Sequence, residues 1–145
     1  MNMIKIPAPL LRQIYDHTES SYPHECCGVM IGTMGENKTV QAFRICKNLN
    51  KERARDRYDM DPLDQLRAEQ EFKNSPWDII GIYHSHPDHP SRPSQTDTDR
   101  AWAAYSYVII SVEKGKVASA QSWVLNEGEK KFYEEPLVSA QGDSK

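Results

Sequence analysis

Two histidines, His84 and His86, lie in the middle of the chain and are followed by Asp97. Imidazole nitrogens and carboxylate oxygens bind divalent metal ions, and catalytic zinc sites use three protein ligands and leave a fourth position open. Residues two apart on a β-strand point to the same face, so both imidazoles can face one ion. The pattern predicts an open metal site, and the ligand types favour zinc over iron or manganese.

The carboxylate ligand of this site has three candidates, Asp88, Asp97 and Asp99. Asp88 follows the second histidine so closely that the chain would have to turn back sharply. Ser94 with Asp97, and Thr96 with Asp99, each match a helix N-cap followed by an acid. Each pair is explained by capping alone, but a carboxylate on a first helical turn is also well held for coordination. We expect Asp97 to be the third ligand.

Glu25 is the candidate general base. It directly precedes an apolar run over 26–31, where burial would keep the pKa of its carboxyl near the working pH. It could then take a proton from a zinc-bound water and pass it to a leaving amine. The competing interpretation is an exposed loop residue, and residue type alone favours that interpretation.

Helical and strand patterns alternate along the chain and must position these residues. Apolar spacing predicts helices over about 8–20 and 62–73, the second with Leu63, Leu66 and Phe72 pointing inward, and a short helix from Ser94 that includes Trp102. Strands are expected over 26–31, 39–46, 77–83, 107–112 and 116–125, with a brief strand over 58–60 and an edge strand over 130–135. The interspersed elements indicate an α/β or α+β fold.

Length and composition fit one domain over 1–138 followed by a flexible tail over 139–145. The formal net charge of −3 gives no basic excess for nucleic acid, and no apolar run has the length of a membrane span. Of the three cysteines, Cys26 and Cys27 are adjacent and Cys46 is separate, which argues against a disulfide framework. A reducing, cytoplasmic location is expected.

The spaced set Glu25, His84-x-His86, Ser94 and Asp97 resembles the motif of the JAMM (MPN-plus) zinc metalloproteases. The segments over 23–28 and 83–87 also look like that family. The resemblance implies the MPN fold, a curved mixed sheet flanked by helices and related to cytidine deaminases. It implies one Zn²⁺ per chain with His84, His86 and Asp97 as ligands. Glu25 would be general base and then acid, and Ser94 would donate a hydrogen bond to the oxyanion.

The family cleaves peptide or isopeptide bonds after the C-terminal tail of ubiquitin or ubiquitin-like proteins. The short spacing from His86 to Asp97 resembles small bacterial members that act on ubiquitin-like sulfur carriers. The resemblance therefore implies a metallopeptidase that hydrolyses the bond after a carrier's terminal glycine. The carrier, the released group, the sulfur pathway and the oligomeric state stay open, as do the roles of His89 and the 51–57 loop.

Three other functions compete with this interpretation. A non-catalytic MPN scaffold could bind zinc structurally, although such members usually lack a ligand. A zinc nucleoside deaminase would need an H-x-E together with a P-C-x-x-C signature, and no P-C-x-x-C occurs. A cysteine nucleophile would need Cys26 or Cys27 activated by His24 or His84, whereas adjacent cysteines in an apolar run are more often buried and inert.

Overall fold

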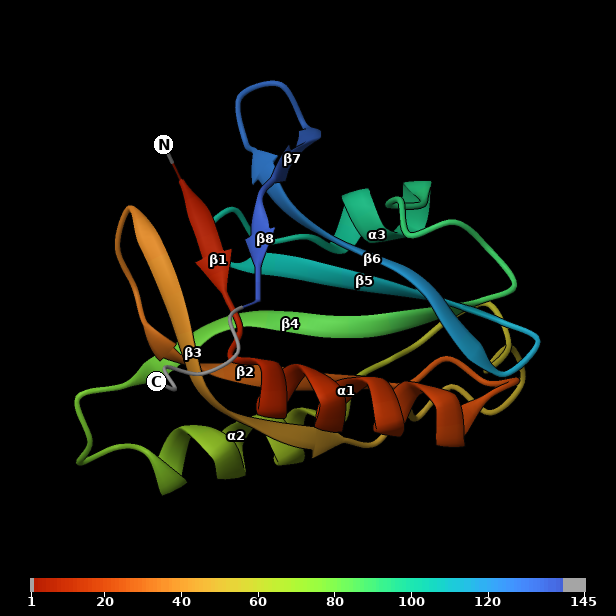
Figure 1. Ribbon diagram of the computed structural model, residues 1–145, viewed down its shortest axis with the longest axis horizontal. Coiled ribbons are helices and arrows are strands. Elements are labelled where there is room, and N and C mark those ends of the chain that lie inside the picture. Colours follow the sequence, from red (N-terminus) through yellow and green to blue (C-terminus); the bar gives the residue numbers. More distant parts are fainter. Residues whose placement is uncertain (1, 140–145) are drawn as a thin grey trace.

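A curved, mixed β-sheet with helices on both faces forms the framework of the protein (Figure 1). The computed structural model describes residues 2–139. The elements in chain order are β1 (Met3–Lys5), α1 (Ala8–Ser21), β2 (Cys27–Thr33), β3 (Asn37–Cys46), α2 (Pro62–Glu71), β4 (Asp78–Pro87), α3 (Gln95–Arg100), β5 (Ser106–Glu113), β6 (Lys116–Asn126), β7 (Lys131–Glu135) and β8 (Leu137–Val138).

The strands lie in the order β7-β6-β5-β4-β2-β3-β1-β8. Strand β2 is antiparallel to both β3 and β4, whereas β4 runs parallel to β5. The two edge strands, β7 and β8, are separated in sequence only by Pro136, so the sheet curls until its edges approach one another. The expected α+β class with a curved mixed sheet is confirmed.

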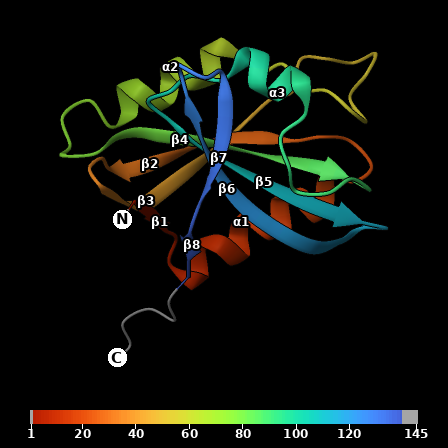
Figure 2. The same cartoon turned by 90° about the horizontal axis from the view of Figure 1, so that it is seen from above.

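The two faces of the sheet are covered by different helices (Figure 2). Helix α1 packs its buried Leu11 and Ile14 on one face, against Met30 of β2 and Ile80 of β4. Helices α2 and α3 lie over the opposite face, where Ala68 of α2 joins a second apolar cluster. Strand β4 is central in the sheet and contributes side chains to both interiors.

Most expected elements are present, with two corrections. The third helix ends at Arg100, because Ala101 adopts an extended conformation, so Trp102 is not helical and its side chain is exposed. In α2, Leu63 and Leu66 are exposed and Ala68 is the buried residue, so these two leucines were wrongly expected to point inward, whereas Phe72 at the end of the helix packs against the apolar cluster as expected. The brief strand over 58–60 is an isolated bridge between Asn48 and Met60.

Strand β4 is longer than expected and continues through Pro87, so both histidines lie on the strand itself. The edge strand β7 is confirmed, but the short strands β1 and β8 carry no sequence pattern that predicted them. Apart from Ser139, the expected flexible tail lies outside the described residues. Within residues 2–139, no helix combines the length and the apolar character needed to cross a membrane.

Candidate metal centre

Strand pairing brings Glu25 to the two histidines. In the antiparallel register of β2 and β4, Cys27 lies opposite His84. The Ser85 N–H donates to the Cys26 carbonyl at 3.1 Å, which continues this pairing beyond β2. One step further along the same register, Glu25 comes opposite His86, and directly opposed residues on antiparallel strands share a face.

Gly28 allows the close approach of β2 to β4. A Cβ atom at this position would lie 2.4 Å from the Tyr83 ring and 2.6 Å from the Arg44 carbonyl oxygen. Real side chains do not tolerate such distances, so the strand needs glycine here. Gly28 therefore has a structural reason, since a larger residue would meet the Tyr83 ring of β4 and the backbone of β3.

Asp97 is positioned by the start of α3. Ser94 is the N-cap, and its Oγ accepts the Asp97 N–H at 3.1 Å. The Asp97 Oδ2 accepts the Ser94 N–H at 2.8 Å in return, which completes a capping box. The same capping interaction that begins the helix thus fixes the carboxylate beside the histidines.

The atoms of the three expected ligands converge. His84 Nε2 and His86 Nε2 are 3.3 Å apart. Asp97 Oδ1 lies 3.4 Å from His84 Nε2, and its Oδ2 lies 3.1 Å from His86 Nε2. Zn–N bonds of about 2.0–2.1 Å at a tetrahedral angle separate two ligand nitrogens by about 3.3–3.4 Å. The spacing of the imidazoles therefore fits a tetrahedral ion, and the group can hold a metal.

The surroundings of the two histidines differ. His86 Nδ1 lies 2.8 Å from the Pro90 carbonyl oxygen, an acceptor that selects the Nδ1–H tautomer and leaves Nε2 free to bind a metal. His84 is fully buried, and its Nδ1 has no hydrogen-bond partner among the described residues. Its ring instead stacks on Tyr58, with centroids 4.5 Å apart and planes 26° apart. Packing against Tyr58, rather than a hydrogen bond at Nδ1, holds this side of the ring.

The surroundings of Asp97, His84 and His86 shift the pKa values of these side chains in different directions. Burial opposes ionisation of Asp97, but hydrogen bonds with His84 and His86 outweigh it and hold the pKa of this carboxyl well below its usual range. Burial lowers the pKa of His84 and keeps it neutral. Burial also disfavours charge on His86, yet the hydrogen bonds to Asp97 and Pro90 raise its pKa overall. A neutral imidazole and an ionised carboxylate are the forms that bind a cation.

Glu25 is buried, with 6% of its surface exposed, so the exposed-loop interpretation does not hold. Burial raises the pKa of its carboxyl to about 8, although the charge of His86 opposes this rise. The Ala54 carbonyl accepts the Glu25 N–H, and Asn48 Nδ2 donates to the Glu25 carbonyl at 3.1 Å. The 47–61 segment therefore holds the backbone of this residue in place.

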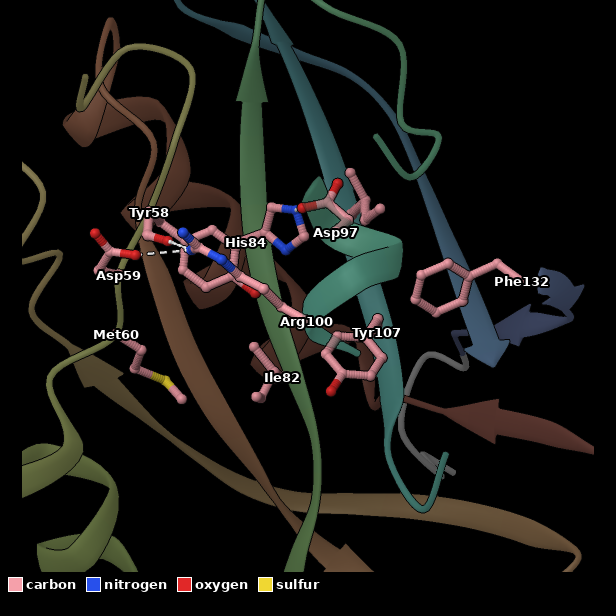
Figure 3. Close-up of a pocket in the computed structure, with 10 residues that line it drawn as sticks. Tyr58, Asp59, Met60, Ile82, His84, Asp97, Arg100, Tyr107 and Phe132 are labelled. Carbon is pink, nitrogen blue, oxygen red and sulfur yellow. Dashed lines mark hydrogen bonds and ion pairs between the residues drawn. The ribbon is translucent and has the colours of Figure 1, made fainter. Parts of the chain in front are cut away.

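Two cavities flank the ligand group. The first, which we call the His84-side cavity, measures about 410 Å³ and is shown in Figure 3. His84 and Asp97 line it together with aromatic and apolar side chains, among them Tyr58, Tyr107 and Phe132. The second, the Glu25-side cavity, measures about 350 Å³ and is lined by Glu25, His86 and Ser94 together with loop residues. A substrate can therefore extend in two directions from the ligand group.

The other acids considered from the sequence are engaged elsewhere. Asp88 accepts hydrogen bonds from the Tyr22 hydroxyl at 2.6 Å and from the Lys114 N–H at 2.9 Å. Asp99 accepts a hydrogen bond from Gln95 Nε2 at 2.8 Å on the surface of α3. Of the three acids weighed, Asp97 is therefore the one beside the histidines.

The sequence did not single out Tyr58 or Arg100. Arg100, at the end of α3, donates to the Tyr58 carbonyl at 2.6 Å and pairs with Asp59 at 2.7 Å across the His84-side cavity (Figure 3). This bridge ties the helix that carries Asp97 to the loop that carries the ring stacked on His84. The basic residue in the last turn of the predicted short helix was the available signal for it.

The cysteines do not have the environment of a nucleophile. Cys26, Cys27 and Cys46 are free and buried. Burial raises the pKa of each thiol, which disfavours the reactive thiolate. The Ser85 hydroxyl contacts Cys26 Sγ at 3.6 Å, and no imidazole hydrogen-bonds to these sulfurs among the described residues.

Three relatives illustrate the similarity of this chain to known proteins. A desampylase of Haloferax volcanii is 35% identical over 106 residues, which cover 72% of this chain and 73% of the relative. Tail tip assembly protein K of Escherichia phage N15 is 30% identical over 127 residues, 86% of this chain but 46% of the relative. The CysO-cysteine peptidase of Mycobacterium tuberculosis is 28% identical over 110 residues, 75% of this chain and 73% of the relative.

The fold has a similar solved counterpart in a protein of Desulfitobacterium hafniense. The two structures agree with a TM-score of 0.83 at 28% identity, over 96% of this chain and 94% of the other. The family model described as prokaryotic homologs of the JAB domain matches residues 7–126, a range that contains every candidate site residue. The chain therefore belongs to the family of prokaryotic homologs of the JAB domain, which confirms its sequence resemblance to the JAMM proteins.

Proposed function

We propose that the protein is a zinc-dependent peptidase or isopeptidase that hydrolyses the bond after the C-terminal glycine of a ubiquitin-like sulfur-carrier protein. The observation that carries the proposal is the convergence of His84, His86 and Asp97 beside the buried carboxyl of Glu25. Relatives named desampylase, CysO-cysteine peptidase and TtuB-protein conjugate cleaving protease support this class of substrate.

The three ligands would hold the zinc ion. Asp97 stays ionised and burial lowers the pKa of His84, whereas His86, whose pKa is raised by its hydrogen bonds to Asp97 and Pro90, would give up its proton when the ion binds. The two Nε2 atoms lie 3.3 Å apart and both face the carboxylate. Zinc bound there supplies a Lewis acid that polarises the substrate carbonyl and acidifies water. The nitrogen and oxygen donor set favours zinc or a similar ion over the harder Ca²⁺ and Mg²⁺, which prefer oxygen alone.

Glu25 would move the proton in this reaction. A carboxyl with a pKa near 8 exchanges its proton close to neutral pH, so it can accept one from water and donate it later. The bond between the terminal glycine carbonyl and the leaving amine breaks. The carrier gains the hydroxyl of water, and the amine departs with the proton that Glu25 received.

Ser94 would stabilise the negative charge that develops on the attacked carbonyl oxygen. Its Oγ accepts the Asp97 N–H, and this bond leaves the hydroxyl proton free to donate. The residue is exposed and lines the Glu25-side cavity, so a substrate oxygen can reach it. One such donor contributes about 3–4 kcal/mol to transition-state stabilisation in other hydrolases.

The test is mass spectrometry of carrier conjugates incubated with zinc-loaded protein. Ubiquitin-like carriers extended after their terminal glycine by one cysteine, or joined there to a lysine side chain, serve as substrates. We expect release of the unmodified carrier from at least one of these conjugates, abolished by a chelator and restored by zinc. Binding of one zinc per chain without hydrolysis of any conjugate would instead support the non-catalytic scaffold. The three free cysteines suit the reducing cytoplasm expected for such carriers.

A further inference from the structure

More basic than acidic side chains line the Glu25-side cavity. Three arginines line it: Arg53, Arg57 and Arg92. Only Arg53 is paired, through two contacts with the Asp56 carboxylate at 3.2 and 2.5 Å. Within residues 2–139, no hydrogen bond or ion pair engages the side chain of Arg57 or of Arg92. Two guanidinium groups are therefore available to a ligand.

Arg57 lies close to the reacting groups. It is half-buried, and its charge acts to lower the pKa of the Glu25 carboxyl, although burial raises that pKa overall. Arg92 is exposed and lies two residues before Ser94, in the loop that leads into α3. The two side chains thus reach the cavity from separate loops, one beside the proposed base and one beside the proposed oxyanion donor.

The His84-side cavity differs from it in charge. Its one arginine, Arg100, is bound by the Asp59 carboxylate and the Tyr58 carbonyl. The rest of its wall combines apolar side chains, as Figure 3 shows for Ile82, Tyr107 and Phe132, with the carboxylates of Asp59 and Asp97, which would repel a second carboxylate. This side therefore suits an uncharged chain, such as the glycine-ending tail of a carrier.

The position of Glu25 gives the direction of the substrate. The residue that protonates the leaving amine must lie on the side from which that amine departs. Glu25 lines the cavity with the free arginines and does not line the other cavity. Resting on the proposed function, we propose that this cavity binds the carboxylate of the leaving group through Arg57 and Arg92, so that the preferred substrate is a carrier extended by a C-terminal amino acid.

The chemistry of the leaving group fits this arrangement. When a single amino acid is released, its free carboxylate is two bonds from the departing nitrogen, whereas a lysine side chain in an isopeptide has no carboxylate nearby. Guanidinium groups bind carboxylates through two parallel, charge-assisted hydrogen bonds. A volume of about 350 Å³ is at the small end of ligand cavities, about 300–1,000 Å³, and suits one residue.

The test compares two substrates that differ in one group. A carrier extended by one cysteine is prepared as the free acid and as the C-terminal carboxamide, and kcat/KM is measured for both. We expect the free acid to be preferred by about 10-fold or more, mainly through KM, because the amide cannot form the charged contacts. Equal rates for acid and amide would overturn the inference and leave the proposed function standing. Hydrolysis of neither, with a lysine-linked conjugate still cleaved, would also overturn the inference and leave the proposed function standing. Hydrolysis of no conjugate at all would contradict the proposed function itself.

Variants assign the effect to the two arginines. Arg92→Gln and Arg57→Gln should each reduce the ratio of acid to amide hydrolysis, and the double variant should bring it close to one. Arg55→Gln is the matched control, since it removes the same charge from the same loop at a residue that does not line this cavity. An unchanged ratio in the double variant would assign the preference to other groups and overturn the inference.

Discussion

The two faces of the sheet are built on the same strands but differ in chemistry. Beneath α1, strand β4 contributes Ile80 and Tyr83 to an apolar cluster, and the charged groups buried on this face, Lys38 and Glu135, are joined through hydrogen bonds to Ser106. On the opposite face, β4 contributes Ile82 to an apolar cluster and then, further along, His84 to the ligand group. Burial of polar and charged groups costs free energy unless they are paired. The α1 face therefore stabilises a fold in which the other face can hold groups suited to chemistry.

This comparison predicts that changes on the two faces have separable effects, and the largest is expected at a ligand. His84→Ala removes a metal-binding nitrogen, so zinc content should fall below one ion per chain and turnover should drop to less than about one thousandth. Metal analysis of the purified variant together with a hydrolysis assay provides the measurement. A variant that keeps stoichiometric zinc and full turnover would remove His84 from the ligand set.

The opposite face supplies the matched control. Ile14→Ala in α1 empties part of the apolar core and should lower the free energy of unfolding by about 2–5 kcal/mol. At a temperature where the variant is folded, its kcat/KM should stay within about twofold of the original, because distant sites act independently. Denaturant unfolding and kinetics on the same preparation would show whether the two faces are separate or coupled.

A smaller loss of turnover is expected when the ligands stay and the base is removed. Glu25→Gln keeps the size and burial of the side chain but cannot take a proton. Zinc content should be unchanged, and turnover should fall by about 100-fold to 10,000-fold, the usual contribution of general acid–base catalysis. Loss of zinc from this variant would mean that Glu25 acts as a ligand.

Ser94→Ala should reduce turnover by about 100-fold with little change in zinc content, because one oxyanion donor is lost. The same change removes the N-cap of α3, at a cost of about 1 kcal/mol. Ser94→Thr separates the two effects, since threonine keeps a hydroxyl that can both cap and donate. Turnover restored by threonine supports the oxyanion role, whereas full activity in the alanine variant would exclude it.

The smallest effect concerns the stability of the metal-free protein. The pKa of Glu25 is about 8 in the folded chain, against 4.5 for a free carboxyl. Because the folded chain favours the protonated form of this carboxyl, its contribution to the free energy of unfolding is fully present below pH 4.5. That contribution is lost as the pH rises through about 8. Between these two pH values, the free energy of unfolding of the original protein should therefore fall by on the order of a few kcal/mol relative to that of Glu25→Gln. Parallel pH dependences for the two proteins would contradict this.

The types and spacing of residues predicted the ligand group because its members are close in the chain. His84 and His86 need only strand alternation, and Ser94 with Asp97 needs only a helix start. The approach of Glu25 could not be derived in this way, since it depends on the register between β2 and β4. Its place before an apolar run made Glu25 a candidate base, but residue type alone favoured an exposed loop residue, and only the resemblance to a family favoured its approach to the histidines.

Elements whose existence depends on tertiary contacts were missed or misplaced. Strand β1 has three residues and is held by parallel pairing on both sides, to β3 and to β8, which no local pattern can indicate. In α2, apolar spacing pointed to Leu63 and Leu66, yet the orientation of the helix on the sheet buries Ala68 and leaves both leucines exposed. Of the two arginines proposed for the Glu25-side cavity, Arg57 lies in the 51–57 loop, whose role the sequence left open, and the sequence did not single out Arg92.

The two edge strands, β7 and β8, are joined through Pro136, and this connection affects how readily the protein aggregates in solution. The Ile4 N–H donates to the Pro136 carbonyl at 3.0 Å, and the Ile6 N–H donates to that of Val138 at 2.9 Å. The unpaired N–H and C=O groups of an exposed edge strand can pair with another chain and so lead to aggregation. In residues 2–139 the two edge strands, β7 and β8, are both short, so they offer few backbone groups for pairing with another chain. Trimming the chain before Pro136 would leave β1 unpaired on one side and open that route.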